Sequence, residues 1–410
     1  MPGTAVDLTV PSLADLHRRR SEKWALHDED VLSLTVAEMD FPIAHPIREA
    51  LFAAIDRNDL GYALARTPTL TGALVGFVGR RLDWAVDPEQ VTVVPDVMVG
   101  LIELCRAIAA PGQAVAFATP AYPPFFAELQ GAGFRLFTVD LDAQGRIELG
   151  ALDSVLSRGV AAFVLTNPHN PTGHVATREE LALLAERCAA AETWVLADEV
   201  HAPMVLPGAD HTPWLEVSDA AREYGIALTS ASKAFNLAAL KTAFIVTAGD
   251  RSREIVSRLT AQHDHASLLG MIAAELAFTE GDTWLDAVVG QLQLNRTQLA
   301  ADLAAQLPEV HWIPPQATYL AWLDCTRLGL GDEPESAFLT QGRVALGRGL
   351  DYGQPGAGTS VSTSQRVQNT SAMPSAGWPS PSSANRSAPL LLVLRRRVDP
   401  DSRIAVVFAR

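Results

Sequence analysis

The stretch Ile226-Ala-Leu-Thr-Ser-Ala-Ser-Lys233 joins a short apolar run directly to a polar turn that ends in a lysine. Similar runs rich in Val, Ala and Phe recur along the chain, and longer segments of helical period separate them. These runs are Val91-Thr-Val-Val94, Ala114-Val-Ala-Phe117, Ala162-Phe-Val-Leu165, Trp194-Val-Leu-Ala197 and Ala243-Phe-Ile-Val246. The alternation predicts an α/β unit around a largely buried sheet.

Polar or turn residues directly follow several of these runs. The segments are Pro95-Asp96, Thr119-Pro-Ala-Tyr122, Thr166-Asn-Pro-His-Asn-Pro-Thr-Gly173, Asp198-Glu-Val-His201 and Ser230-Ala-Ser-Lys233. Ligand-binding groups of α/β proteins gather where the strands of the sheet end. We therefore expect a single cleft to which all of these segments contribute.

Length, composition and charge narrow the classes of function. A chain of 410 residues with 48% hydrophobic residues suits one large α/β unit and a smaller domain. Its net charge of -15 argues against a general affinity for nucleic acid or anionic membrane, because both need a basic face. The apolar run at residues 390–394 is too short to cross a bilayer. The amino terminus does not show the basic-then-apolar pattern of a signal peptide.

The cysteines point to a reducing compartment. Cys105, Cys188 and Cys325 are widely spaced and form no CxxC motif or metal-binding pattern. Neither a disulfide framework nor a metal site is therefore expected. The sequence predicts a cytoplasmic enzyme.

Together, the segments at the strand ends resemble those of the fold-type I enzymes that use pyridoxal 5'-phosphate (PLP), in the aminotransferase class I/II superfamily. They are most similar to its cystathionine β-lyase or C-S lyase branch, from Lys23 to Gly358. The resemblance implies a large domain with a mostly parallel central sheet and a smaller α/β C-terminal domain. We expect residues 1–45 to join the small domain, 46–285 to form the large domain, and 286–358 to form a truncated small domain.

In this resemblance, Lys233 carries PLP as a Schiff base and, once released, takes the proton from the substrate's Cα. Asp198 matches the carboxylate that keeps the pyridine nitrogen protonated, so that the ring can accept electrons. Glu199 lies on the other side of the strand and is expected to be structural.

Further contacts to the cofactor ring are implied by two segments of the same resemblance. Asn170 matches the asparagine that hydrogen-bonds the 3'-oxygen, and Tyr122 matches the aromatic residue that stacks on the ring. His201 stands where aminotransferases usually have tyrosine, which favours the lyase branch. The segment Val36-Ala-Glu-Met-Asp-Phe41, with Lys23-Trp24 before it, favours the same branch.

The resemblance also implies ligands for the phosphate. Ser230 and Ser232 supply hydroxyl groups, whereas Val97 and Met98 supply backbone N–H groups at the start of a helix. The family often has glycine where Asp96 stands, so we expect the Asp96 carboxylate to point away. Lys241 takes the place of a cationic phosphate ligand.

One matched tyrosine implies an assembly. Tyr62 corresponds to a tyrosine that reaches the phosphate of the neighbouring subunit's cofactor, which predicts a homodimer with shared sites. The expected substrate is a sulfur amino acid such as cystathionine, cleaved to a thiol, pyruvate and ammonia in amino-acid biosynthesis.

After Gly358 the chain departs from the family. Residues 359–398 contain no Asp or Glu in an otherwise acidic protein, and Ser, Pro, Ala and Arg dominate. We expect residues 359–410 to be an aberrant, disordered tail. A frame change near codon 359 explains it, because one added nucleotide permits His-Val-Arg-Leu-Asn-Phe-Ala-Thr, which is similar to the family's continuation. An in-frame gene for this same protein in related strains would contradict that hypothesis.

The frame change bears on the substrate. In the family, the arginine of that segment grips the α-carboxylate with two hydrogen bonds, which Val361 cannot do. We therefore expect a PLP-binding protein of impaired activity.

Three other functions remain open. An aminotransferase shares the early steps but needs a 2-oxo acid acceptor. A non-catalytic protein with the same fold would act by binding a partner and would not need Lys233. An α/β protein without any cofactor is the least consistent with several motifs in the family's order.

Overall fold

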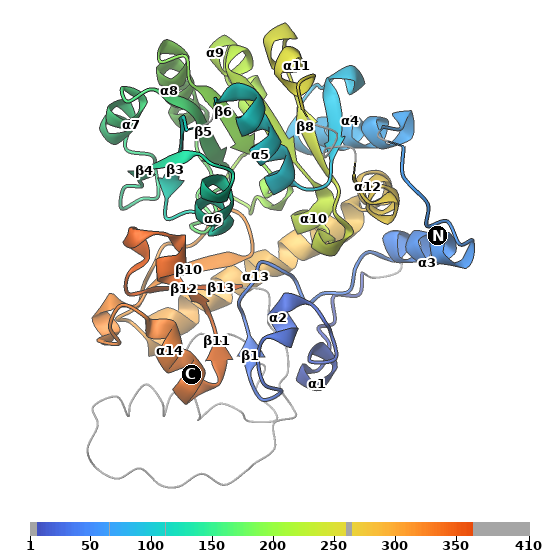
Figure 1. Ribbon diagram of the computed structural model, residues 1–410. Coiled ribbons are helices and arrows are strands. Elements are labelled where there is room, and N and C mark those ends of the chain that lie inside the picture. Colours follow the sequence, from blue (N-terminus) through green and yellow to red (C-terminus); the bar gives the residue numbers. More distant parts are fainter. Residues whose placement is uncertain (1–5, 65, 111, 260–264, 364–410) are drawn as a thin grey trace, which may run out of the picture.

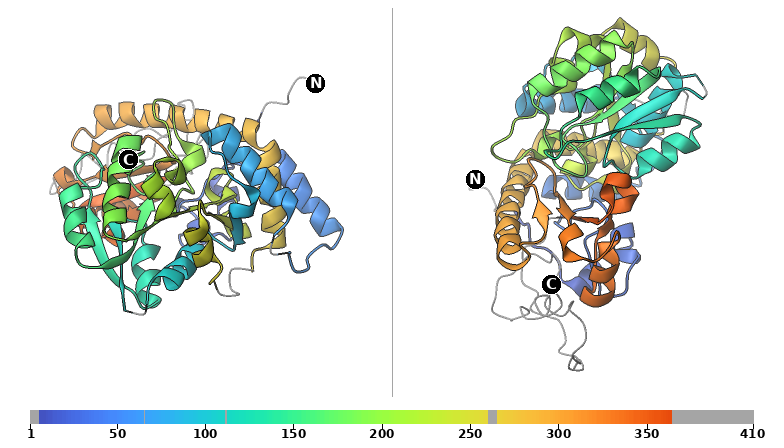
Figure 2. Two further views of the ribbon diagram at one scale, coloured as in Figure 1. Left: turned by 90° about the horizontal axis from the view of Figure 1, so that it is seen from above. Right: turned by 90° about the vertical axis from the view of Figure 1, so that its left-hand side faces the viewer.

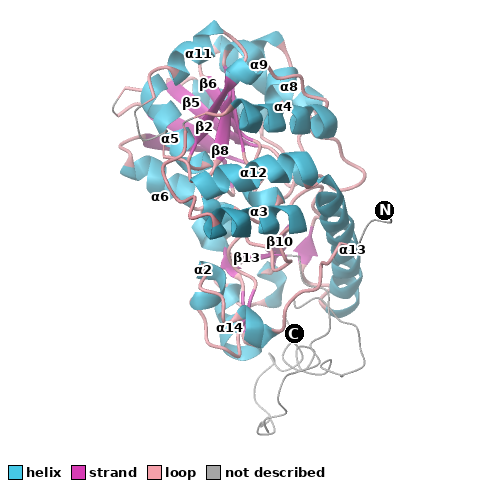
Figure 3. Ribbon diagram, turned by 90° about the vertical axis from the view of Figure 1, so that its right-hand side faces the viewer, coloured by secondary structure: helices cyan, strands magenta, loops and turns pink. Residues whose placement is uncertain are grey.

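A computed structural model describes residues 6–64, 66–110, 112–259 and 265–363. The larger domain, with the central sheet, lies above a smaller domain to which both ends of the described chain contribute (Figure 1). The long helix α13 (Asp282–Gln306) runs from one to the other, as the side views also show (Figures 2 and 3). Within the described residues, no helix combines the length and apolarity needed to cross a membrane.

The central sheet confirms the expected fold class. Its order is β2-β8-β7-β6-β5-β3-β4, and only β8 runs antiparallel to its neighbours. Its strands are β2 (Val91–Val94), β3 (Ala114–Thr119), β4 (Arg135–Asp140), β5 (Val160–Thr166), β6 (Trp194–Asp198), β7 (Gly225–Thr229) and β8 (Ala243–Val246). The apolar runs predicted six of these strands. The edge strand β4 escaped prediction because most of its side chains are not fully buried, which breaks the apolar run.

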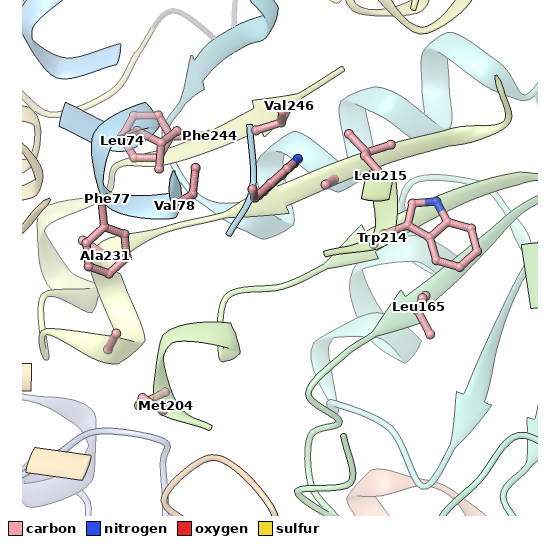
Figure 4. Close-up of a cluster of buried hydrophobic side chains, with 14 of the residues drawn as sticks. Leu74, Phe77, Val78, Leu165, Met204, Trp214, Leu215, Ala231, Phe244 and Val246 are labelled. Atoms are coloured by element: carbon pink, nitrogen blue, oxygen red, sulfur yellow. The ribbon is translucent and has the colours of Figure 1, made fainter. Parts of the chain in front are cut away.

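Helices cover both faces of this sheet because its strands are apolar on both sides. In β3, for example, Val115 and Phe117 face one buried cluster, whereas Ala114, Ala116 and Ala118 face the other. The first cluster is covered by α5 (Val97–Ile108), α6 (Pro124–Gly131) and α11 (Asp250–Val256). The second is covered by α4 (Pro68–Leu82), α7 (Leu149–Leu156), α8 (Arg178–Ala190), α9 (Asp219–Glu223) and α12 (Leu268–Glu280). Figure 4 shows part of the second cluster, with α4 next to β8.

The small domain combines segments from both ends of the described chain. A four-stranded antiparallel sheet has the order β12-β13-β10-β9, and β1 (Leu32–Ser33) pairs in parallel with β11 (Val344–Ala345). The sheet strands are β9 (His311–Trp312), β10 (Leu320–Asp324), β12 (Gly347–Arg348) and β13 (Thr359–Thr363). The remaining helices are α1 (Leu13–Leu16), α2 (Glu22–Ala25) and α14 (Pro334–Gly342) here, and α3 (His45–Asp56) at the junction. Leu16, Trp24 and Leu34 share one apolar cluster with Leu299 and Phe338.

Strand β13 continues the fold beyond the boundary expected at Gly358. It pairs with β10 and β12, and all of its residues are buried, so the expectation of disorder is wrong for residues 359–363. The remainder of the expected tail, residues 364–410, lies outside the described residues. The prediction failed because it considered only composition. The five residues of β13 are ordered by backbone hydrogen bonds to two neighbouring strands, which composition does not reveal.

The side chains of β13 alternate between two environments. Ser360 and Ser362 pair with Leu323 and Ala321, which belong to the apolar cluster of the small domain. Both serines are fully buried, and neither hydroxyl group has a hydrogen-bond partner among the described residues. Val361 pairs with Trp322 and belongs to the other cluster. The serine face of the strand is therefore polar where its surroundings are apolar.

We expect the double variant Ser360→Ala/Ser362→Ala to be more stable than the parent chain. A buried hydroxyl group without a partner costs about 1 to 3 kcal/mol, so removing both should raise the free energy of unfolding by roughly 2 kcal/mol. Urea unfolding followed by circular dichroism measures this. Ser252→Ala is the matched control, because the Ser252 hydroxyl is satisfied by Gly249, and this variant should lose stability. A double variant no more stable than the parent would contradict the prediction.

Candidate active site

The predicted site residues meet where the strands of the central sheet end. Asp198 is the last residue of β6, and Ser230 follows β7 and caps the short helix α10 (Ala231–Ala234), which carries Lys233. Because β8 runs antiparallel, its beginning lies at the same edge, which brings Lys241 close to the end of β2. The parallel strands end at this edge of the sheet and the reversed strand β8 begins there. Residues from distant parts of the sequence are thus brought to one edge.

Lys233 has a partly buried side chain at the centre of this site. Its Nζ donates a hydrogen bond to the backbone carbonyl of Ala37 at 3.1 Å. Burial lowers the pKa of the Lys233 amine, and the carboxylates of Glu38 and Asp198 oppose part of that effect. A lysine whose neutral form is favoured in this way is suited to nucleophilic attack on an aldehyde and to proton abstraction.

Asp198 places a carboxyl group near this amine. The side chain is 7% exposed, and its Oδ1 accepts a hydrogen bond from the Val200 N–H at 3.1 Å. Burial raises the pKa of the Asp198 carboxyl to about 6, although Val200 and the Lys233 charge lower it. A buried carboxylate that lacks a full ionic partner destabilises the folded chain. A cationic ring nitrogen beside Asp198 would supply that partner and remove this cost.

Two buried side chains at the site have polar atoms without a hydrogen-bond partner in the part of the chain that the structure describes. They are Oδ1 of Asn170 and Nδ1 of His201, on residues that are 6% and 1% exposed. Burial, together with the Lys233 charge, lowers the pKa of His201 to about 3, so this ring is neutral. Buried polar atoms in proteins are normally satisfied, which makes these two candidates for contacts to a bound ligand.

Tyr122 contributes an aromatic ring. Its ring lies edge-on to Phe125, with the centroids 5.6 Å apart. Burial, followed by the charge of Asp198, raises the pKa of Tyr122 to about 12, so its hydroxyl stays protonated. Tyr122 follows the end of β3, which runs parallel to β5 and β6, so it lies at the same edge of the sheet as Asp198 at the end of β6.

The first turn of α5 and the serines after β7 are the two segments from which the sequence predicts phosphate ligands. The Asp96 side chain caps α5 by accepting from the Val99 N–H at 2.7 Å, which leaves the N–H groups of Val97 and Met98 without helical partners. Ser230 Oγ donates to the Thr242 carbonyl at 2.7 Å and accepts from the Ser232 N–H. The helix dipole favours an anion at this position.

Asp96 was expected to point away, but the structure gives it a defined partner. Its Oδ2 lies 2.7 Å from Nζ of Lys241, 145 residues away in sequence. Lys241 is therefore paired, and it would have to be shared between Asp96 and a phosphate. The sequence contains no signal for this pair, because only the antiparallel direction of β8 creates it.

Tyr62 does not join these residues within one chain. It follows α3 in a segment where its side chain is fully exposed. No described residue of the same chain buries it. Its predicted role therefore depends entirely on a second chain.

Sequence reasoning missed the residues that hold the N-terminal segment over Lys233. Tyr319 donates to the Ala37 carbonyl at 2.8 Å, the same oxygen that Lys233 contacts. The Asn236 side chain forms a pair of hydrogen bonds with the backbone of Met39, at 2.9 and 2.8 Å. The feature of the sequence that could have indicated these contacts is Asn236, three residues after Lys233.

A buried ion pair anchors the same segment from the other side. Nζ of Lys23 lies 3.0 Å from Asp40 Oδ2, and Trp24 Nε1 donates to Asp40 Oδ1 at 2.9 Å. Both charged side chains are buried. The two sequence features that pointed to the lyase branch, residues 23–24 and 36–41, are therefore in direct contact.

The donor set fits a phosphorylated pyridine aldehyde. A partly buried amine, a buried carboxylate, an aromatic ring, two polar atoms without a partner among the described residues and a helix N-terminus correspond to its aldehyde, ring nitrogen, ring face, ring oxygen and phosphate. Within the described residues, no cluster of His, Cys, Asp or Glu side chains is arranged to hold a metal ion.

Known proteins show the same combination of sequence and fold. The family model of aminotransferase class I and II matches residues 29–353. The chain is 34% identical over 347 residues to the cystathionine beta-lyase of Corynebacterium glutamicum, covering 84% of this chain and 92% of that protein. It is 32% identical over 351 residues to the cystathionine beta-lyase PatB of Bacillus subtilis strain 168, covering 83% and 90%.

A solved structure has a matching fold. Cystalysin from Treponema denticola, whose crystal structure contains pyridoxal 5'-phosphate, superposes with a TM-score of 0.82 over 88% of this chain and 95% of that chain. The two sequences are 23% identical, so this likeness concerns the fold.

Proposed function

Because the chain belongs to the class I and II aminotransferase family, we propose that it is a PLP-dependent carbon-sulfur β-lyase that cleaves cystathionine-like amino acids. The observation that carries this proposal is that Lys233, on α10 directly after β7, and the buried Asp198, at the end of the adjacent strand β6, come from neighbouring strand ends of one sheet. The relatives named as cystathionine beta-lyases support the substrate class.

When bound, PLP supplies an electron-accepting ring next to the Cα atom of the amino acid. Lys233 takes the Cα proton, because burial favours its neutral form. Asp198 would hold the positive charge of the ring nitrogen, and Asn170 and His201 would supply polar atoms that no described residue satisfies. Once the Cα proton is removed, the Cβ–S bond would break with its electron pair on sulfur, so that a thiolate leaves. One water would then hydrolyse the unsaturated amino acid that remains to pyruvate and ammonia.

The test of this function is release of pyruvate from L-cystathionine by the purified, PLP-loaded protein, with no 2-oxo acid added. We expect pyruvate, ammonia and a free thiol in equal amounts. Amino-group transfer that requires an added 2-oxo acid, without pyruvate release, would show an aminotransferase instead.

Val361 is proposed to limit this activity. It is buried on β13 opposite Trp322. Val361 and the Tyr352 hydroxyl both border the neighbouring Gly347, because a side chain added at Gly347 would contact both of them. The Tyr352 carbonyl accepts from Ala121, next to Tyr122. Val361 therefore lies near Tyr352, whose backbone contacts the segment that carries Tyr122, and its aliphatic side chain cannot pair with a substrate carboxylate.

We expect Val361→Arg to lower the KM for L-cystathionine by about 10-fold to 100-fold, because charge-assisted hydrogen bonds contribute about 1.5 to 3 kcal/mol. Steady-state pyruvate release measures it. Val361→Leu, which changes size but not charge, is the control and should leave KM near the parent value. An arginine variant that stays folded by circular dichroism and has an unchanged KM would contradict this placement of the carboxylate.

The frame change is also a proposal, and the alternation along β13 supports it. In the permitted alternative frame, residues 360 and 362 would be Val and Leu, at the two positions where the present serines have unsatisfied hydroxyls in an apolar cluster. The arginine of that frame would take position 361, on the opposite face. Sequencing the gene from related strains tests it.

We also propose a homodimer. Phe52, Leu60, Tyr62 and Leu64, on and after α3, are large apolar side chains that are exposed in a single chain. Such a group of exposed apolar residues is typical of an interface. Sedimentation equilibrium should give twice the mass of one chain, and a monomer at micromolar concentration would contradict the proposal.

A cytoplasmic role in amino-acid biosynthesis is proposed on a simpler basis. Cys105, Cys188 and Cys325 are all buried and unpaired, as suits a reducing compartment. Fractionation of cells should recover the activity with cytoplasmic marker enzymes.

A further inference from the structure

A second buried acid-base pair lies behind the site and plays no part in the chemistry above. Glu199 directly follows Asp198, and its side chain is 1% exposed. Its Oε1 accepts from the Trp214 N–H at 2.6 Å and lies 3.5 Å from Nε2 of His211, whose side chain is also 1% exposed. The loop before Trp214 thus brings a histidine against a buried carboxylate.

The other ring nitrogen of His211 faces Asn167. Nδ1 of His211 lies 3.5 Å from Nδ2 of Asn167. The Asn167 Oδ1 accepts from the Ala176 N–H at 3.0 Å, which fixes the orientation of the amide and makes Nδ2 the donor. His211 therefore accepts at Nδ1 and carries its proton on Nε2, which lies 3.5 Å from Glu199 Oε1 without forming a hydrogen bond to a described residue.

Asn167 connects this pair to the cofactor site. Its backbone N–H donates to the Asp198 carbonyl at 3.0 Å, and its loop continues to Asn170. Asn167 is buried, as is Asn170 with its unsatisfied Oδ1. The position of Asn170 relative to Asp198 therefore depends on how the Asn167 side chain is held.

We propose that His211 is a positioning residue, which accepts from Asn167 and is oriented by Glu199 so that the loop of residues 167–170 presents Asn170 to the cofactor. This inference rests on the proposed PLP binding. Second-layer partners of this kind orient the groups that touch a ligand without touching it themselves.

Two variants of His211 separate this role from simple packing. An asparagine side chain places its amide at the position of Nδ1, whereas a glutamine side chain places its amide near Nε2. His211→Asn keeps an acceptor for Asn167, and His211→Gln keeps a donor for Glu199. Each variant therefore loses one of the two contacts of His211, and both keep a polar amide group at this position.

The measurement is an absorbance titration of the cofactor-free full-length chain with PLP, alongside thermal unfolding of the same samples. We expect His211→Gln to weaken PLP binding by about 5-fold to 10-fold, the effect of one hydrogen bond, and His211→Asn to remain within about 2-fold of the parent. A Gln variant that binds PLP as the parent does, or two variants that lose affinity equally, would overturn the proposal. A parent chain that does not bind PLP would instead contradict the proposed function.

Discussion

We expect Lys233→Ala to abolish pyruvate release from L-cystathionine, with a loss of about 10³-fold or more. The substitution removes the only group at the site that we assign to covalent attachment and to proton abstraction. Proton transfer by a positioned side chain alone contributes about 10²-fold to 10⁴-fold. Pyruvate formation by the PLP-loaded variant, assayed beside the parent, measures the loss.

The chain offers a strict control for the site of attachment. Its only lysines are Lys23, Lys233 and Lys241. Lys23 and Lys241 are paired with Asp40 and Asp96 at 3.0 and 2.7 Å, whereas Lys233 contacts the Ala37 carbonyl. Reduction with borohydride followed by peptide mapping should therefore label Lys233, and Lys241→Arg should leave that label in place. Label on Lys241 in the parent chain would contradict the assignment.

The second large effect is expected for Asp198→Asn, which should lower kcat by about 10²-fold to 10³-fold. An amide keeps the acceptor for the Val200 N–H but carries no charge for the ring nitrogen. Loss of one preorganised electrostatic contact to the reacting group typically costs this much. PLP affinity should fall in the same variant, as measured by absorbance titration.

The cofactor-free form of the same variant should become more stable. Burial raises the Asp198 pKa from 3.8 to about 6, so the folded chain binds more protons than the unfolded chain between about pH 4 and pH 6. Stability of the parent therefore falls as pH rises through this window. At about 1.4 kcal/mol per tenfold change in proton affinity, the asparagine variant gains up to about 3 kcal/mol above pH 6 and nothing near pH 4.

Urea unfolding of the cofactor-free chains at pH 4, 5, 6 and 7 checks this pattern. A variant that is less stable than the parent at pH 7 would show that the carboxylate is satisfied by the protein itself. In that case its assignment to a bound cation would lose its physical basis.

The sequence by itself determined the α/β class, most of the central strands and the positions of Asp198 and Lys233 at strand ends. Buried strands must be apolar on both faces, so their runs are visible locally, and Asp198 and Lys233 stand directly after such runs. Strand ends of a parallel sheet share one edge, so the meeting of these residues also followed from local pattern.

Only the tertiary structure decided what surrounds them. The reversal of β8 brings Lys241 to Asp96, and folding of the N-terminal segment brings Ala37 to Lys233 across 196 residues of sequence. Strand β13 was mistaken for disordered chain because its polar composition hides its two strand partners. These contacts arise from strand direction and domain packing, which join residues with no local periodicity in common, so no window of the sequence carries a signal for them.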